Sequence, residues 1–229
     1  MTKDIADRQA RDAANRDRPL SPGQIALALA PFIGGLELSS TQIEKIRDYV
    51  ELLIAWNRRV SLTSIEDPAE IVARHFGESI LAASTVPIRN GRLADVGTGA
   101  GFPGLPLKIV SDELDVVLLE PNNRKCAFLN EVKRKLELDK VEVTRSRYEE
   151  YSRNDAAPFD FVCSRALGDY RRLLRWAKTM LAPSGKVILW LGEEGSILVG
   201  RTPGWSWNLP IRIPESAKRV IQVGHPTAG

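Results

Sequence analysis

A glycine-rich turn between a short apolar strand and a helix constrains the fold of this 229-residue chain more than any other feature. The segment from Leu93 to Gly104 reads LADVGTGAGFPG, and the apolar stretch from Leu105 to Val110 follows it. Glycine adopts positive φ and lets a ligand approach the main chain where a Cβ would block it. The next helix offers unpaired N–H groups and a partial positive charge at its first turn. The sequence therefore predicts a turn that holds a nucleotide-like cofactor.

Two cofactors fit such a turn. Gly99 to Gly104 matches G-x-G-x-x-G, the dinucleotide pattern, so a NAD-dependent oxidoreductase is one alternative. Asp95 favours S-adenosylmethionine (SAM), because Asp-x-Gly-x-Gly-x-Gly is typical of SAM-dependent methyltransferases. A carboxylate suits the cationic amino group of the methionine moiety, whereas it would repel a pyrophosphate. We therefore predict that Asp95, Gly97, Gly99 and Gly101 form a SAM site.

A second acidic residue completes the predicted cofactor site. Residues 115–120 read as a buried parallel strand that ends in Glu120. Glu120 lies about 20 residues beyond the glycines, where a carboxylate hydrogen-bonds the ribose hydroxyls of a bound nucleotide. The alternative is a surface acid at a strand end. We predict the ribose role.

Alternating strands and helices after Arg92 predict an α/β fold, a doubly wound, Rossmann-like and mostly parallel sheet of the SAM-dependent methyltransferase type. Strands are expected at 92–96, 115–120, 141–144, 159–164 and 186–191, and helices at 105–110, 124–138 and 170–181. Two short runs at 211–213 and 219–223 predict a terminal antiparallel hairpin. Helices at 22–31, 41–59 and 71–85 predict an N-terminal helical extension. The expected organisation is a disordered tail (1–20), this extension packed on the body (21–90) and the methyltransferase domain (91–229).

Composition narrows the class of protein. The net charge is only +3, and the two cysteines, Cys126 and Cys163, lack the CxxC spacing of a zinc ribbon. His75 and His225, the two histidines, form no metal-binding cluster in the sequence. No apolar run has membrane-spanning length. We expect a cytoplasmic protein without metal or membrane association, and a monomer.

Several motifs occur together in one order and identify a family. They are WNRRVSLTSI at Trp56–Ile65, Arg74-His75-Phe76, the glycine turn followed by Leu105-Pro106-Leu107, RKCAFL at Arg124–Leu129, and Ser164-Arg165-Ala166. The set resembles the bacterial 16S ribosomal RNA guanine-N7 methyltransferase family (RsmG, formerly GidB) over about residues 43–192. The resemblance implies methyl transfer from SAM to N7 of a guanine in the 530 loop of 16S rRNA. It also implies 16S rRNA or the small ribosomal subunit as partner.

The resemblance further implies which residues contact the cofactor. They are Gly97 and Phe102 in the turn, Glu120, Tyr148 and Glu149 after the third strand, and Arg165. Three positions depart from the family pattern: Ser61 replaces Asn, Tyr148 replaces Ala, and Leu191 replaces Lys ahead of Glu193-Glu194. These departures keep two alternatives open, a SAM-dependent methyltransferase with a different substrate and a non-catalytic RNA-binding protein on the same fold.

Methylation of guanine N7 asks for alignment more than for acid–base chemistry, because N7 already carries a lone pair. We predict Arg165 as the catalytic residue, since it ends the fourth strand at the edge where such sheets bind ligands. The alternative for Arg165 is a surface ion pair. His75 is predicted as an RNA-contact or structural histidine rather than a base. Cys163 lies inside the expected strand and is predicted to be a buried, unreactive thiol.

RNA binding is the weaker inference. Lys and Arg exceed Asp and Glu by five between Pro121 and Lys178. We predict RNA contacts from Arg58, Arg59, Arg74, His75 and Arg124, which would hold phosphates in a salt-dependent way. Lys133-Arg134-Lys135 is predicted to be a solvated helix face.

Overall fold

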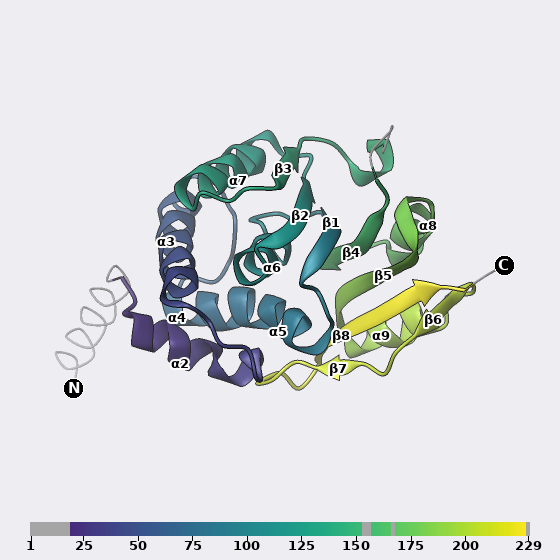
Figure 1. Cartoon of the computed structure of the whole chain (residues 1–229), viewed down its shortest axis with the longest axis horizontal. Helices are drawn as coiled ribbons and strands as arrows, with labels where there is room; N and C mark the ends of the chain where they lie inside the picture. The colour runs from purple at the N-terminus through teal and green to yellow at the C-terminus, as the bar shows by residue number, and fades with distance from the viewer. Residues whose placement is uncertain (1–18, 153–156, 166–167, 228–229) are drawn as a thin grey trace, which may run out of the picture.

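The computed structural model describes residues 19–152, 157–165 and 168–227 and contains an eight-stranded sheet covered by helices (Figure 1). The strand order is β3-β2-β1-β4-β5-β8-β6, and β7 pairs with β8 beside this path. The strands are β1 Asn90–Val96, β2 Glu113–Leu119, β3 Val141–Thr144, β4 Phe159–Arg165, β5 Leu181–Gly192, β6 Trp205–Trp207, β7 Ile211–Arg212 and β8 Arg219–Pro226. The strands β1 to β5 are parallel, whereas β8 is antiparallel to its partners β5, β6 and β7. The predicted fold class is therefore confirmed.

Nine helical segments surround this sheet in the described residues. They are α2 Pro22–Ile33, α3 Ser40–Asn57, α4 Pro68–Ile71, the π-helical turn η1 Val72–Gly77, α5 Glu78–Thr85, α6 Gly104–Val110, α7 Asn123–Lys135, α8 Tyr170–Met180 and α9 Glu193–Gly200, beside the short 3-10 turn η2 Tyr148–Glu150. Capping boxes start α2 and α3, where Ser21 pairs with Gln24 and Ser39 with Gln42. The residues before Pro19, which hold most of the predicted tail, lie outside the described part.

Alternation along the strands produces two apolar layers. In β4, Phe161 and Cys163 face one cluster, and Val162 faces the other. The first cluster includes residues of α5, α6 and α7 together with α2 and α3 of the helical extension. The second includes residues of α8 and α9. Figure 1 shows α3 and α7 on one side of the molecule, and α8 and α9 on the other.

The topology places a ligand-binding edge at the carboxyl ends of β1, β2 and β4. Strand order reverses between β1 and β4, because the chain moves from β1 outward to β3 and then returns to β4 on the other side of β1. Open α/β sheets bind ligands at such a switch point. The glycine turn leaves β1 at this point, and Glu120 and Arg165 lie at the ends of the two neighbouring strands.

The third helix differs from its prediction. It begins at Pro68 rather than Ile71, because the Asp67 side chain caps it by accepting the Glu70 N–H at 2.8 Å. Its middle is not α-helical but forms the π-helical turn η1. The helix α9 and the strand β6 were not predicted. Gly195 and Gly200 disfavour a helix, and a three-residue strand gives almost no period-two pattern.

Candidate functional site

Three glycines shape the turn after β1, and they serve different purposes. Gly97, Gly99 and Gly101 have φ values of 68°, 61° and 91°, which side chains rarely adopt. A Cβ on Gly101 would collide with the Tyr49 hydroxyl and with Leu105. A Cβ on Gly99 would meet only the Gly97 carbonyl, at 4.0 Å. The turn is therefore packed against protein at Gly101 and open at Gly99.

Replacing Gly101 with alanine is expected to lower the free energy of unfolding by about 2–4 kcal/mol, since backbone strain and overpacking add at this position. Gly99→Ala is the matched control. It carries the strain of positive φ alone, about 1 kcal/mol, and places its methyl group on the open side. Urea unfolding gives the stabilities, and calorimetry gives the affinity for SAM. Equal stability of the two variants would contradict this account of the turn.

Asp95 lies beneath the turn and fastens its two ends. Its side chain is fully buried, and Oδ2 accepts hydrogen bonds from Thr98 Oγ1 at 2.5 Å and from Gly104 N at 2.8 Å. Oδ1 has no hydrogen-bond partner in the described part of the chain. Burial raises the pKa of Asp95 to about 6. The sequence predicted contact with a cofactor amino group, whereas this structure directs the carboxylate toward the turn itself.

Glu120 joins the turn to the start of α7. It is only 5% exposed, and its two oxygens accept the backbone N–H groups of Gly99 at 3.0 Å and Asn122 at 2.9 Å. The surface-acid alternative for Glu120 is thus wrong. Each carboxylate oxygen has a second lone pair, so Glu120 can still accept hydrogen bonds from a ligand beside Gly99.

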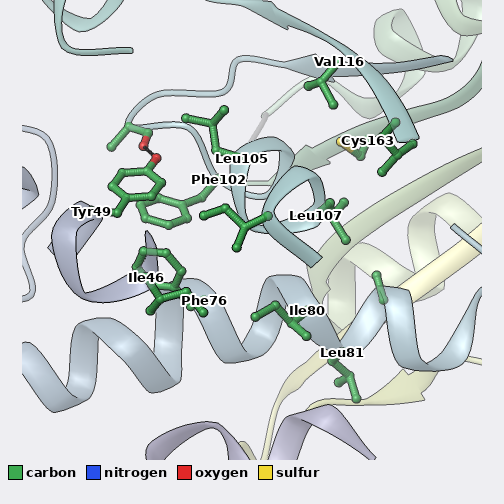
Figure 2. Packing of buried hydrophobic residues seen from close by; sticks show 14 of the residues in the cluster. Ile46, Tyr49, Phe76, Ile80, Leu81, Phe102, Leu105, Leu107, Val116 and Cys163 are labelled. Atoms are coloured by element: carbon green, nitrogen blue, oxygen red, sulfur yellow. Dashed lines mark hydrogen bonds between the residues drawn. The ribbon is translucent and has the colours of Figure 1, made fainter. Parts of the chain in front are cut away.

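The helical extension clamps the turn through an aromatic cluster. The Phe102 ring lies between Tyr49 of α3, with centroids 5.4 Å apart, and His75 of η1, with centroids 4.7 Å apart. Phe76 contacts Phe102 edge-on. Figure 2 shows Tyr49 and Phe76 gathered around Phe102, and the Tyr49 hydroxyl donates to the Ala100 carbonyl. Phe102 is 4% exposed, so its family-implied cofactor contact would involve little of its ring.

Arg165 is held by neutral acceptors rather than by the alternative surface ion pair. Its Nη2 donates to His75 Nδ1 at 2.8 Å, and its Nη1 donates to the Arg74 carbonyl at 3.1 Å. The guanidinium carbon also lies 5.3 Å from the centre of the Phe102 ring. The structure therefore brings Arg165, His75 and Phe102 together, although they are far apart in the sequence.

His75 is neutral in this arrangement. Since Nδ1 accepts from Arg165, the ring proton is on Nε2, which donates to Thr63 Oγ1 at 2.7 Å. Burial, reinforced by Arg165 and Arg74, lowers the pKa of His75 to about 3. Both nitrogens are engaged within the protein, which favours the structural alternative over the predicted RNA contact. Thr63 was not predicted as a site residue.

The π-helical turn creates the acceptor for Arg165. The Glu78 N–H donates to the Ala73 carbonyl, five residues back, rather than to Arg74 as it would in an α-helix. The Arg74 carbonyl instead accepts Arg165. Single π turns within helices occur frequently at functional sites, and here the turn orients both partners of Arg165.

A cavity of about 720 Å³ adjoins Arg165 and His75. Its buried floor is Glu78, 3% exposed, which pairs with Arg74 at 3.1 Å and with Arg219 of β8 at 2.8 Å. The sequence did not predict Arg219 as a site residue. Its position opposite Gly192 follows from the antiparallel register of β8 and β5, which no local pattern reveals.

The remaining predicted residues lie around this centre. Tyr148 and Glu149 form η2, where the Tyr148 ring packs edge-on against Trp176 and Glu149 pairs with Arg172 at 3.1 Å. Arg58 and Arg59 follow the end of α3, and Arg124 occupies the first turn of α7. These three arginines are exposed and do not line the 720 Å³ cavity. Of the predicted RNA contacts, only Arg74 and His75 do so.

Two kinds of site are absent from the described residues. They contain no group of three or more His, Cys, Asp or Glu side chains placed to hold a metal ion. None of their helices combines the length and apolar character needed to cross a bilayer.

The fold and the turn define the class of SAM-dependent methyltransferase folds. A ribosomal protein L11 methylase from Lactobacillus delbrueckii subsp. bulgaricus superposes with a TM-score of 0.56 at 13% identity, covering 68% of this chain and 80% of that one. A MtNAS variant in complex with S-adenosylmethionine superposes with a TM-score of 0.57 at 15% identity. The superposition covers 89% of this chain and 78% of that one. At these identities the likeness concerns the fold alone.

The sequence comparisons identify the family. The family model of rRNA small subunit methyltransferase G (GidB) matches residues 42–197, and the chain belongs to this family, as predicted. Curated relatives with the name ribosomal RNA small subunit methyltransferase G include proteins of Desulfitobacterium hafniense and Roseiflexus castenholzii. The Desulfitobacterium hafniense protein is 40% identical over 161 residues, 69% of this chain and 66% of the relative. The Roseiflexus castenholzii protein is 38% identical over 199 residues, which make up 82% of this chain and 85% of the relative. The chain thus spans just under two thirds of the first of these relatives.

Proposed function

We propose that this protein transfers the methyl group of SAM to N7 of a guanine in the 530 loop of 16S rRNA. Membership of the rRNA small subunit methyltransferase G family supports the reaction and the rRNA substrate. The observation that carries the proposal is the open face of the glycine turn at Gly99, between Glu120 and the Arg165–His75 pair. The predicted catalytic and cofactor residues remain part of this proposal, with Asp95 acting from beneath the turn.

The residues around the turn fit SAM. Gly99 leaves room for a ligand against the main chain, and Glu120 beside it retains lone pairs for ribose hydroxyls. The buried carboxylate of Asp95 lies under the same turn, and its negative charge complements a cationic cofactor at neutral pH. When bound, SAM supplies an electrophilic methyl group on a sulfonium.

The neighbouring side chains suit a nucleophile that needs no deprotonation. His75 cannot act as a base, since its pKa is about 3 and both of its nitrogens are engaged. Guanine N7 attacks with its own lone pair, so the protein has to orient the base and exclude water. Arg165, fixed at two points, presents a planar cation at the cavity wall, where it can contact the guanine edge or a phosphate.

The departure at Leu191 does not alter the cavity wall. The Leu191 side chain is 3% exposed within the second apolar cluster, and Glu193 pairs with Arg212 at 3.2 Å. Arg219, opposite Gly192 in the sheet, supplies a cation at this edge of the cavity. The substitution of the family lysine therefore gives no reason to prefer a different substrate.

The test is a map of N7-methylguanine in 16S rRNA from cells with and without the gene. We expect one methylated guanine, in the 530 loop, to disappear in the deletion strain and to return with the wild-type gene but not with Arg165→Lys. An identical methylation map in the strains with and without the gene would contradict the proposal. Calorimetry with SAM and with NAD would separate a failure of the substrate assignment from a failure of the cofactor assignment.

A further inference from the structure

A second cavity, of about 480 Å³, lies on the other side of the sheet, between α8 and the segment that follows α9. Four of its lining residues are cations, and no acidic residue lines it. We call these four the basic face: Arg171, Arg175, Lys178 and Arg201. Arg171, Arg175 and Lys178 are spaced i, i+4 and i+7 on α8, so they share one side of the helix over about 10 Å.

The charge of the basic face is not compensated by nearby carboxylates. All four side chains belong to exposed residues, and none forms an ion pair with another described residue. By contrast, Arg172 on the same helix pairs with Glu149. Lys178 lies over the Trp205 ring, 5.9 Å from its centre. Like charges at i and i+4 destabilise an isolated helix, so this arrangement favours an anionic partner.

The location of α8 relates the basic face to the site. Strand β4 ends at Arg165 on the ligand-binding edge, and α8 starts at Tyr170 and returns alongside the sheet. The basic face therefore begins near this edge and continues away from it. Its near end lies next to Arg172, whose partner Glu149 is a proposed cofactor contact. Figure 1 shows α8 and α9 across the molecule from α3 and α7.

We propose that the basic face binds the sugar–phosphate backbone of the rRNA substrate outside the target nucleotide. This inference rests on the proposed function. Three of the four cations are arginines, whose planar guanidinium groups match phosphate oxygens in a bidentate way. Trp205 is only 8% exposed, so the face offers charge rather than a ring on which bases could stack. The contact positions RNA without reading its sequence.

The test compares two triple variants of the full-length chain. The first is Arg171→Gln/Arg175→Gln/Lys178→Gln. The matched control, Lys133→Gln/Arg134→Gln/Lys135→Gln, removes the same charge from the last turn of α7 in the other helical layer. The measurements are the Kd for a 16S rRNA transcript at several salt concentrations, the Kd for SAM, and KM and kcat for methylation.

We expect the α8 variant to bind the transcript about 10- to 100-fold more weakly than the control. The slope of log K against log[salt] is expected to fall by about two to three, at close to one unit per lost phosphate contact. KM for RNA rises, while kcat and the Kd for SAM stay at the wild-type values. The inference would be overturned if both triple variants lost RNA affinity equally, or if neither lost any.

The single variant Arg175→Gln covers the case in which the α8 triple variant does not fold. Because Arg175 is exposed and unpaired among the described residues, this variant is expected to melt like the wild type and to reduce the salt slope by about one. An unchanged slope would overturn the inference. If the wild-type protein bound 16S rRNA but did not methylate it, the proposed function would be contradicted instead.

Discussion

Asp95→Asn is expected to make the protein more stable at pH 7 and a much weaker binder of SAM. Burial raises the pKa of Asp95 from its ordinary value of 3.8 to about 6, so the folded state holds the proton more tightly than the unfolded state. The stability contributed by the protonated carboxyl is fully present below pH 3.8 and is lost as the pH rises through 6. Ionisation at neutral pH therefore costs about 3 kcal/mol.

The isosteric amide avoids this cost and gives up about 1 kcal/mol, because its uncharged oxygen accepts the Thr98 and Gly104 hydrogen bonds more weakly than the carboxylate does. The free energy of unfolding of Asp95→Asn relative to wild type is thus expected to rise by about 2–2.5 kcal/mol between pH 4 and pH 7. Urea unfolding across this range measures the difference. Asp139→Asn, at an exposed position, is the control variant for the loss of one carboxylate.

The affinity for SAM is expected to move in the opposite direction, falling about 100-fold at pH 7 because the negative charge beneath the turn is lost. Calorimetry measures this directly. If Asp95→Asn bound SAM as tightly as the wild type, the buried charge would have no part in cofactor binding. In the proposal, therefore, the negative charge of Asp95 destabilises the free protein. The positive charge of bound SAM offsets this loss of stability.

His75→Phe is expected to lower kcat for methyl transfer about 10- to 100-fold while leaving the Kd for SAM nearly unchanged. Phenylalanine preserves the stacking on Phe102 but removes the acceptor that fixes Arg165 Nη2. A hydrogen bond to a charged group contributes about 1.5–3 kcal/mol, which corresponds to this range of rates. His75→Asn restores an acceptor near the position of Nδ1 and is expected to recover part of the rate. An Asn variant no better than the Phe variant would contradict the positioning role.

His75 is expected to make the folding stability depend on pH in the opposite direction to Asp95. The pKa of His75 falls from 6.5 to about 3 on folding, so the unfolded state binds the proton more readily. The stability from the neutral ring is present above pH 6.5 and is lost as the pH falls toward 3, by about 2 kcal/mol at pH 5. His75→Phe is expected to lose this acid sensitivity. His225→Phe, at an exposed position on β8, is the control that retains it.

The sequence predicts those parts of the site that depend on local patterns. The glycine turn and the acid at the end of the next strand follow from spacing alone, and the strand order that brings Glu120 to Gly99 follows from the alternation of elements. Arg165 was found because it ends a strand. The hydrogen-bond partners of Arg165 could not be predicted, because His75 and Arg74 lie 90 and 91 residues away along the chain.

Two kinds of information lay outside such patterns. The register between β5 and β8 decides that Arg219 enters the cavity, and no short segment encodes it. The buried position of Asp95 also depends on Gly104, which packs directly on its side chain. The basic face of α8 is different, because the spacing of Arg171, Arg175 and Lys178 is readable in the sequence. Only the absence of acidic residues from the cavity lining and of ion pairs to described residues distinguishes it from a solvated helix face.

The π-helical turn makes the length of one helix a condition for activity in the proposed mechanism. A π turn has one residue more than the α-helical turn it replaces. Loss of any single residue between Val72 and Gly77 would let the segment close as a regular α-helix, with the Glu78 N–H returning to the acceptor four residues back. The carbonyl that the π turn leaves free for Arg165 would then be deleted or drawn into the helix. Members of this family are thus expected to tolerate substitutions at Ala73 more readily than a change in the number of residues between Asp67 and Glu78.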